Sequence, residues 1–188
     1  MTAHTAAGKL QGLSDDALWY EAALVVGITN ALNVVADSLE PVSAPEPAEL
    51  RQTFDEIRAF YASDEIPLPF RVTAVDPAYT RDVWLATRHG FSDHRLTRRL
   101  KEALAFAVSV TTHSKFGSGF HLAEMRRLGV GMGGVMEVLG VTQMFSSYTK
   151  IADTLQLEPD MADLAPPDPS PAPGGVTTIA PPTRDGAR

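Results

Sequence analysis

The sequence predicts an all-α protein, and three features of its 188 residues support this fold class. Apolar residues recur three and four positions apart over several long segments, the spacing of one helix face. Proline gathers between these segments and so marks where helices end. Alternation of apolar and polar residues, typical of a strand, is confined to residues 70–75. With 44% apolar and 21% charged residues, the chain can form a hydrophobic core.

About six helices are expected, of which three lie in the first half of the chain. The first covers residues 14–39, because Ser14, Asp15 and Asp16 can cap its start and apolar residues follow at helical spacing. The second and third cover residues 48–62 and 76–90. Between them, the Ile-Pro-Leu-Pro-Phe segment at residues 66–70 is expected to be extended.

The other three expected helices follow in close succession. Ser92 and Asp93 are placed to cap a fourth helix that runs to about His113. Gly117 and Gly119 are expected to break it, so that a fifth helix covers residues 118–127. The sixth covers residues 133–156.

The first and last expected helices resemble each other in sequence. Residues 17–39 align with residues 133–155 without a gap, so that Glu21 falls on Glu137. Both copies end in Ala-Asp-(Ser/Thr)-Leu. The alternative is that any two core helices look alike, but the shared end favours a partial repeat.

Composition divides the chain into four parts and excludes several classes of protein. The parts are an N-terminal helical segment, a proline-rich linker, a helical domain and a disordered Pro/Ala/Gly tail, at residues 1–40, 41–47, 48–161 and 162–188. A net charge of −7 argues against a nucleic-acid partner. The chain has no cysteine, which excludes disulfides, thiolate nucleophiles and thiolate metal sites. No signal peptide and no apolar run longer than residues 22–26 are found, so we expect a soluble, cytoplasmic protein without a membrane segment.

One segment carries residues suited to acid/base chemistry. Glu102, Phe106, Ser109 and His113 fall on one face of the fourth helix. A glycine-containing turn follows, and His121 lies near the start of the next helix. If these helices fold back on each other, Glu102 and His121 can face one pocket as a general acid/base pair that needs no cofactor.

The same segment resembles a known active-site signature. Arg99-x-Lys101-Glu102, eleven residues, then Ser114-x-x-Gly117-x-x-x-His121 resembles the signature of the carboxymuconolactone decarboxylase family and its alkylhydroperoxidase D-like relatives. The resemblance covers roughly residues 48–160, with residues 12–40 similar to the closing helix of a preceding copy. It implies an alkylhydroperoxidase D-like helical fold and a homo-oligomer, a trimer or hexamer.

The chain departs from the thiol members of that family at both cysteines of their CxxC, which are Ser114 and Gly117 here. In those members the Glu and His activate the cysteines for peroxide reduction, so thiol peroxidase activity is excluded. The decarboxylase branch acts on a lactone acid without cysteine, metal or organic cofactor and also keeps the His. We therefore expect neither a metal site nor a cofactor.

The candidate catalytic residues are Glu102 and His121, and candidates for orienting groups or pocket walls are His113, Ser114, Phe116, Gly117 and Phe120. Several of these residues can instead have a purely structural role. Glu102 can be a solvated helix residue, His121 a core histidine and His113 a partner of the helix dipole. Ser114 is favoured as a helix cap over a substrate contact. On the first helix, Asn30 and Asn33 can form interhelical hydrogen bonds.

Two hypotheses of function follow. The first is a cofactor-independent decarboxylase, isomerase or lyase acting on a small organic acid or lactone. The second is a non-catalytic member that serves as an oligomeric or ligand-binding subunit, and it is favoured if Phe106, Phe116 and Phe120 fill the pocket. A third hypothesis is that this chain functions only together with a partner protein that carries cysteines.

Overall fold

The computed structural model describes residues 3–40 and 45–156, and within these ranges the chain is all-α, as predicted, with no strand. The described residues form eight α-helices rather than about six, because α1 and α4 were not expected. The α-helices are α1 (Ala3–Leu10), α2 (Asp16–Ser38), α3 (Arg51–Tyr61), α4 (Leu68–Thr73), α5 (Pro77–Phe91), α6 (Arg98–Thr111), α7 (Lys115–Arg127) and α8 (Met132–Leu155), and the 3-10 helix η1 (Ala48–Leu50) precedes α3.

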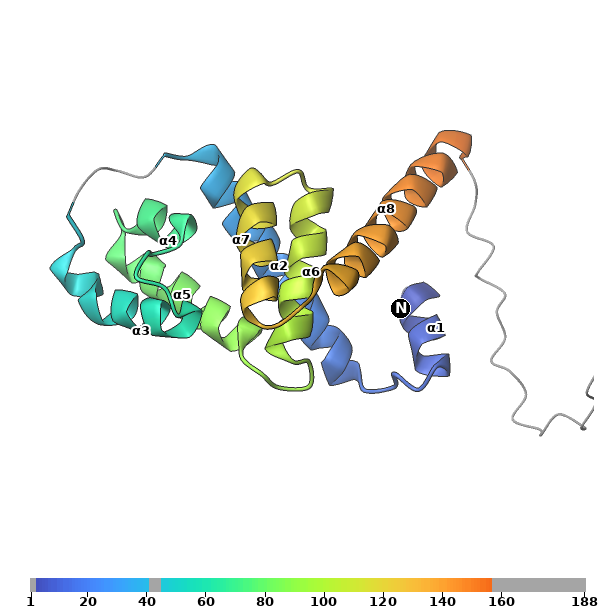
Figure 1. The fold of residues 1–188 in the computed structure, drawn as a ribbon, viewed down its shortest axis with the longest axis horizontal. Helices are drawn as coiled ribbons and strands as arrows, with labels where there is room; N and C mark the ends of the chain where they lie inside the picture. Colours follow the sequence, from blue (N-terminus) through green and yellow to red (C-terminus); the bar gives the residue numbers. More distant parts are fainter. Residues whose placement is uncertain (1–2, 41–44, 157–188) are drawn as a thin grey trace, which may run out of the picture.

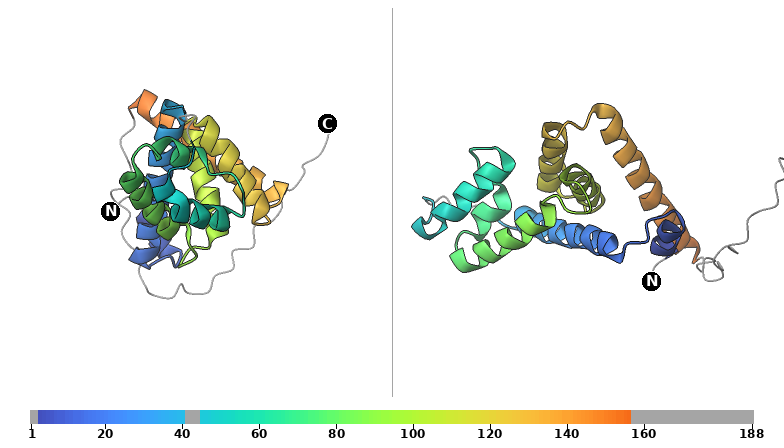
Figure 2. Two further views of the ribbon diagram at one scale, coloured as in Figure 1. Left: turned by 90° about the vertical axis from the view of Figure 1, so that its left-hand side faces the viewer. Right: turned by 90° about the horizontal axis from the view of Figure 1, so that it is seen from below.

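The centre of the fold is the pair α6 and α7, with α2 packed across both (Figure 1). On one side of this centre lie η1, α3, α4 and α5. On the other side α8 leaves the body as a long arm (Figure 2). The site residues on α6 and α7 are therefore enclosed by α2 and by the α3–α5 group.

Helix α2 begins where the sequence predicts, because the Asp15 carboxylate accepts a hydrogen bond from the backbone N–H of Ala17 (2.9 Å). By length and composition it is the one helix within the described ranges that could cross a membrane, which differs from the expectation that the chain has no membrane segment. Its packing accounts for one of its faces. Val25 and Ala36 are buried in the core, and Glu21 and Asn33 are buried against α6, so this face of α2 is part of the core of the fold.

The segment expected to be extended contains helix α4. Pro69 does not prevent this, because it lies in the first turn, where backbone N–H groups have no partner within the helix. The strand-like alternation at residues 70–75 is also misleading. Phe70 and Val72 are both buried, and residues 70–73 are helical.

The boundaries between α5, α6 and α7 differ from the prediction. Thr97 caps α6, and Asp93 instead accepts a hydrogen bond from the N–H of Arg98. Helix α7 starts at Lys115 with Ser114 as its cap, so Gly117 lies inside the helix and does not break it. A glycine inside a helix is less favourable than alanine by about 1 kcal/mol. Glycine is nevertheless needed at position 117, because neighbouring side chains leave no room for a Cβ.

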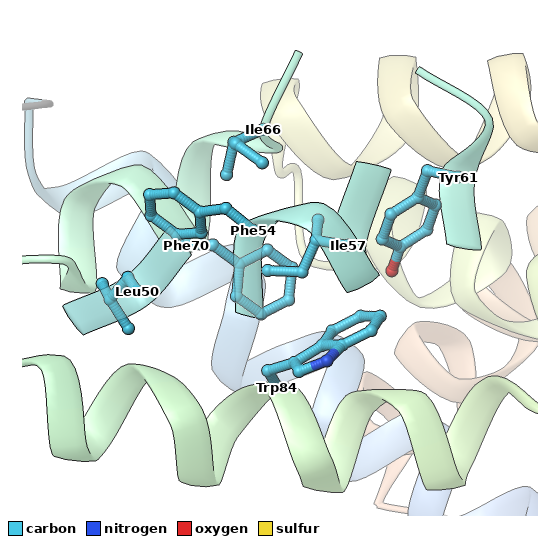
Figure 3. Close-up of a cluster of buried hydrophobic side chains, with 7 residues drawn as sticks. All are labelled: Leu50, Phe54, Ile57, Tyr61, Ile66, Phe70 and Trp84. Atoms are coloured by element: carbon cyan, nitrogen blue, oxygen red, sulfur yellow. The ribbon is translucent and has the colours of Figure 1, made fainter. Parts of the chain in front are cut away.

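The largest hydrophobic cluster joins η1 and helices α3, α4 and α5 (Figure 3). It comprises Leu50, Phe54, Ile57, Tyr61, Ile66, Phe70 and Trp84. Tyr61 lies at its edge nearest α7 and contacts Phe120 ring to ring, with centroids 5.1 Å apart. The cluster thus forms one wall of the region around His121.

The two similar helices, α2 and α8, have different surroundings. Five residues of α2 are buried, Glu21, Val25, Thr29, Asn33 and Ala36, whereas in α8 only Val135 is buried. Part of the expected linker, residues 41–44, and the expected tail at residues 162–188 lie outside the described residues.

Candidate functional site

Glu102 and His121 are in direct contact, as the acid/base hypothesis requires. His121 Nδ1 lies 2.7 Å from Glu102 Oε2, and both side chains are buried. Because a carboxylate only accepts hydrogen bonds, Nδ1 carries the proton that it donates to Glu102. Within the described part of the chain the other ring nitrogen, Nε2, makes no hydrogen bond, so it is free to exchange a proton with a small molecule.

Two aromatic rings hold the imidazole in place. Phe91 stacks parallel to His121, with an angle of 8° between the ring planes and 5.8 Å between centroids. Phe120 meets the imidazole edge to face at 5.3 Å. Together with Glu102, these rings fix both the position and the orientation of the histidine.

A half-buried arginine, Arg98, compensates the charge of Glu102. Arg98 Nε lies 3.5 Å from Glu102 Oε1, and its terminal nitrogens bind Glu124 Oε2 (2.8 Å) and the carbonyl of Phe60 (2.7 Å). Its guanidinium carbon lies 3.8 Å above the Phe60 ring centre. Arg127 also binds Glu124, at 2.7 and 2.9 Å. The result is a network of two arginines and two glutamates behind the histidine.

Tyr61 contributes a phenol to the same region. Its burial raises its pKa well above the usual 10, and the nearby Glu102 carboxylate raises it further. The phenol therefore stays protonated at neutral pH and can serve as a neutral polar group but not as a base.

A small cavity adjoins His121. Its volume is about 10 Å³, which is room for one water molecule. The lining residues are Leu32, Asn33, Tyr61, Pro67, Pro69, Phe70, Phe91, Phe116, Phe120 and His121. Phe116 and Phe120 stack on each other with centroids 5.3 Å apart. Both are half-buried, as are Leu32 and Pro67 of the same lining.

Phe106 does not line this cavity, unlike Phe116 and Phe120. It packs with Met125 and Val135 on the other side of α6. Of the three phenylalanines that were expected to fill the pocket if the protein is non-catalytic, Phe116 and Phe120 line the cavity and Phe106 does not. The direct Glu102–His121 contact favours the acid/base hypothesis. The small volume of the cavity favours the hypothesis of a non-catalytic subunit.

Gly117 stands where the thiol members of the similar family have the second cysteine of their CxxC. The space for a side chain at this position is filled by Asn33. A Cβ on Gly117 would lie 2.1 Å from Asn33 Oδ1 and 2.4 Å from Ser109 Oγ. Ser109 Oγ donates to the Ala105 carbonyl and so accepts from Asn33 Nδ2 (3.0 Å). Asn33 thus forms the interhelical hydrogen bond considered from the sequence, and it leaves no space for a side chain at position 117.

His113 and Ser114 lie outside the cavity. His113 has a left-handed backbone (φ 60°) after the end of α6 and is exposed, because the helix stops at Thr111 before the Glu102 face can continue to it. His113 is therefore not among the residues that line this cavity. Ser114 is buried, and its Oγ accepts from the Gly117 N–H at 3.0 Å, which is the helix cap that the sequence favoured.

Sequence reasoning missed Arg98, Tyr61 and Phe91. The spacing of Arg98 and Glu102, four residues apart on one helix, was a usable signal for an ion pair. No comparable signal existed for Tyr61 and Phe91, since only the tertiary fold brings α3 and α5 to α7. Within the described ranges, no group of three or more His, Asp or Glu side chains could hold a metal ion.

Among solved structures, the chain is similar to the crystal structure of the alkylhydroperoxidase AhpD core from Rhodospirillum rubrum. The identity is 25%, the TM-score is 0.58, and the match covers 62% of this chain and 87% of the other. This confirms the expected alkylhydroperoxidase D-like all-α fold, here without any cysteine. No family model matches the sequence, and no curated protein sequence matches it.

Proposed function

We propose that the protein is a cofactor-independent enzyme that transfers protons on a small organic acid or lactone, as a carboxymuconolactone decarboxylase-like decarboxylase, isomerase or lyase. The observation that carries this proposal is the 2.7 Å contact between His121 and Glu102 beside a cavity. In this arrangement Glu102 fixes the tautomer of His121 and stabilises its protonated form, while Nε2 exchanges the proton.

In such a reaction His121 can both remove and return the proton. Neutral His121 takes a proton from a carbon next to a carbonyl, and the electron pair moves onto that carbonyl as an enolate. The imidazolium returns the proton to the opposite face of the same carbon, which is an epimerisation, or, in a substrate with a further conjugated double bond, to the γ-carbon of the dienolate, which shifts the double bond. In a decarboxylation the electron pair is instead released when CO₂ leaves, and protonated His121 supplies the proton that the carbon needs.

A substrate of this kind is larger than the cavity, which holds about one water. We propose that Phe116 and Phe120, which line the cavity and are partly exposed, move to admit it. Arg98 is assigned a positioning role, since it touches Glu102 but does not line the cavity.

The small cavity also favours a second candidate function. If Phe116 and Phe120 stay closed, no organic substrate reaches His121, and the protein is a non-catalytic alkylhydroperoxidase-like subunit. In that case the Glu102–His121 pair holds α6 to α7 and contributes to stability alone.

One experiment separates the two candidates. Purified protein is screened against small lactones and β-keto acids, and the Glu102→Gln and His121→Ala variants are assayed in parallel. If the protein is an enzyme, each variant loses activity by roughly 10²–10⁴-fold while its helical circular dichroism is retained. The control is His89→Ala, an exposed histidine at the end of α5, which should keep full activity. Absence of turnover, with a lowered melting temperature in both variants, would support the non-catalytic subunit.

We further propose that the protein is cytoplasmic and forms a homo-oligomer, a trimer or hexamer. The support for oligomerisation is the amount of apolar surface left exposed on helices α2 and α8.

A further inference from the structure

The side-chain amide of Asn33 has one atom bound and the other without a partner. Asn33 Nδ2 donates to Ser109 Oγ (3.0 Å), whose own proton goes to the Ala105 carbonyl (2.8 Å). This fixes which way round the amide lies, because Ser109 has no second proton to donate to it. Asn33 is 3% exposed, and within residues 3–40 and 45–156 its Oδ1 accepts no hydrogen bond. A buried acceptor is costly unless a ligand or a water supplies the donor.

This acceptor and the imidazole of His121 belong to one cavity, which both residues line. Asn33 Oδ1 lies beside Gly117, since a Cβ there would be 2.1 Å from it. Gly117 is one helical turn before His121 on the same face of α7, and side chains at that spacing start about 5–6 Å apart. Two acceptors that share one water lie about 4.5–5.5 Å apart. The spacing therefore suits one water between Asn33 Oδ1 and His121 Nε2, and the cavity of about 10 Å³ has room for it.

Two acceptors are what a water needs in order to attack a carbonyl group. One hydrogen of the water is held by Asn33 Oδ1 and the other by His121 Nε2, so that both lone pairs of its oxygen stay available. Nε2 can take the proton, because Nδ1 of the same ring is bound to Glu102 at 2.7 Å and the carboxylate stabilises the imidazolium that forms. Asn33 thus orients the water, and His121 activates it.

We propose that Asn33 and His121 bind one water as a nucleophile and that the protein hydrolyses small lactones. The proposal rests on the proposed function in two respects, since it uses the same His121–Glu102 pair and the same entry of substrate past Phe116 and Phe120. It goes beyond that function because the proton is taken from a water oxygen and not from a carbon. It also gives the buried Asn33 a role for which proton transfer at carbon has no need.

The reaction consumes one lactone and one water and yields one hydroxy acid. The water oxygen forms a bond to the carbonyl carbon while its proton passes to His121 Nε2, and the carbonyl electron pair moves onto the carbonyl oxygen. When this tetrahedral oxyanion collapses, the bond between the carbon and the ring oxygen breaks. The imidazolium then protonates the leaving alkoxide, which returns His121 to its neutral form. No oxidant, reductant or cofactor is consumed.

The full chain provides the first test. It is incubated with γ-butyrolactone and δ-valerolactone in water labelled with oxygen-18, and we expect the hydroxy acid with the label in its carboxylate. Exchange of the hydrogens on the carbon next to the carbonyl is followed in deuterium oxide in parallel. Hydrolysis without exchange would support this proposal and count against proton transfer at carbon. Exchange without hydrolysis, or no reaction of either lactone, would overturn this proposal, and the first of these results would leave the proposed function standing.

Substitution of Asn33 provides the second test. In Asn33→Ala the water loses one of its two acceptors, so kcat for hydrolysis should fall roughly 100-fold with KM little changed, whereas Asn33→Asp keeps an oxygen there and should retain most of the rate. The matched control is Thr29→Val, one turn earlier on α2. Thr29 Oγ1 is also buried without a hydrogen bond in the described part of the chain, but Thr29 does not line the cavity, so the variant should hydrolyse at the natural rate.

Helical circular dichroism shows whether each variant is folded. A folded Asn33→Ala that hydrolyses at the natural rate would refute the role of Asn33. An equal loss in Thr29→Val would also refute it, because disturbed packing of α2 would then be the cause.

Discussion

At the scale of single residues, the fold depends on polar groups that are buried with their partners. Lys101 on α6 is completely buried and forms an ion pair with Glu21 of α2 and a hydrogen bond with the Ser92 carbonyl. Glu21 also accepts hydrogen bonds from the N–H groups of Arg95 and Leu96, at 3.1 and 3.4 Å. One glutamate thus ties α2 to the α5–α6 loop and to α6.

This arrangement predicts a pH-dependent effect of Glu21→Gln. Burial by itself raises the pKa of Glu21, but the hydrogen bond and charge of Lys101 and the two backbone N–H groups outweigh it, so the pKa is lowered below the usual 4.5. The stabilisation is therefore complete above pH 4.5 and is lost as the pH falls through the lowered value. We expect Glu21→Gln to reduce the free energy of unfolding by about 3 kcal/mol at pH 7, and by progressively less below pH 4.

Urea unfolding at pH 7 and pH 3 measures this difference. The control is Asp15→Asn, because Asp15 pairs with Arg95 at the surface and asparagine keeps the helix cap; it should change stability little at either pH. An effect of Glu21→Gln that is equally large at pH 3 would mean that the ion pair is not its cause.

Gly117 supports a second prediction at this scale. A methyl group there would overlap Asn33 and Ser109, so Gly117→Ala should destabilise the protein by about 2 kcal/mol despite the better helix propensity of alanine. In the double variant Asn33→Ala/Gly117→Ala, the overlap with Asn33 is removed, so the two costs should be less than additive. Thermal unfolding of the four proteins of this cycle measures the coupling, and full additivity would contradict the proposed overlap.

At the scale of elements, the start of α7 shows how one cap sets the position of the site. Ser114 closes the first turn of the helix by accepting the Gly117 N–H, and this start places His121 on the side of α7 that faces Glu102. The helix continues through two glycines that would favour a break. Capping and packing thus outweigh local propensity in this element.

The role of Ser114 as a cap can be measured. Ser114→Ala removes the acceptor and leaves the Gly117 N–H without its partner, so we expect a loss of about 1 kcal/mol in the free energy of unfolding. Ser118→Ala, inside the same helix, should change stability by only a few tenths of a kcal/mol. If Ser114→Ala were as stable as the natural chain, the cap would be dispensable and a ligand contact would be the better explanation of this serine.

At the scale of the whole molecule, the N-terminal segment is part of the fold of the rest. Helix α2 supplies Asn33 and Leu32 to the cavity beside His121, and its Val25 packs with Phe91 and Ala105 in one cluster. The boundary drawn at residues 41–47 from proline content therefore separates segments of the chain that share a core.

We predict that a fragment lacking residues 1–40 does not fold cooperatively, because Lys101 loses its ion partner and the α6–α7 pair loses its cover. Its thermal transition should be broad or absent, and it should bind a hydrophobic dye. Removal of residues 162–188, the tail predicted from composition, is the matched truncation and should leave the transition unchanged. A fragment that melts sharply near the temperature of the full chain would show that residues 1–40 are an accessory segment.

The sequence by itself determined the all-α class, the bounds of α2, α5 and α8 to within two residues, and the pair Glu102 and His121. These features depend on periodicity, caps and spacing, which are local properties of the chain. Tertiary structure decided what surrounds the pair: Arg98 behind Glu102, the Phe91 ring on His121, Asn33 against Gly117 and the small size of the cavity. These contacts join helices far apart in sequence, and they depend on packing distances that no local pattern encodes.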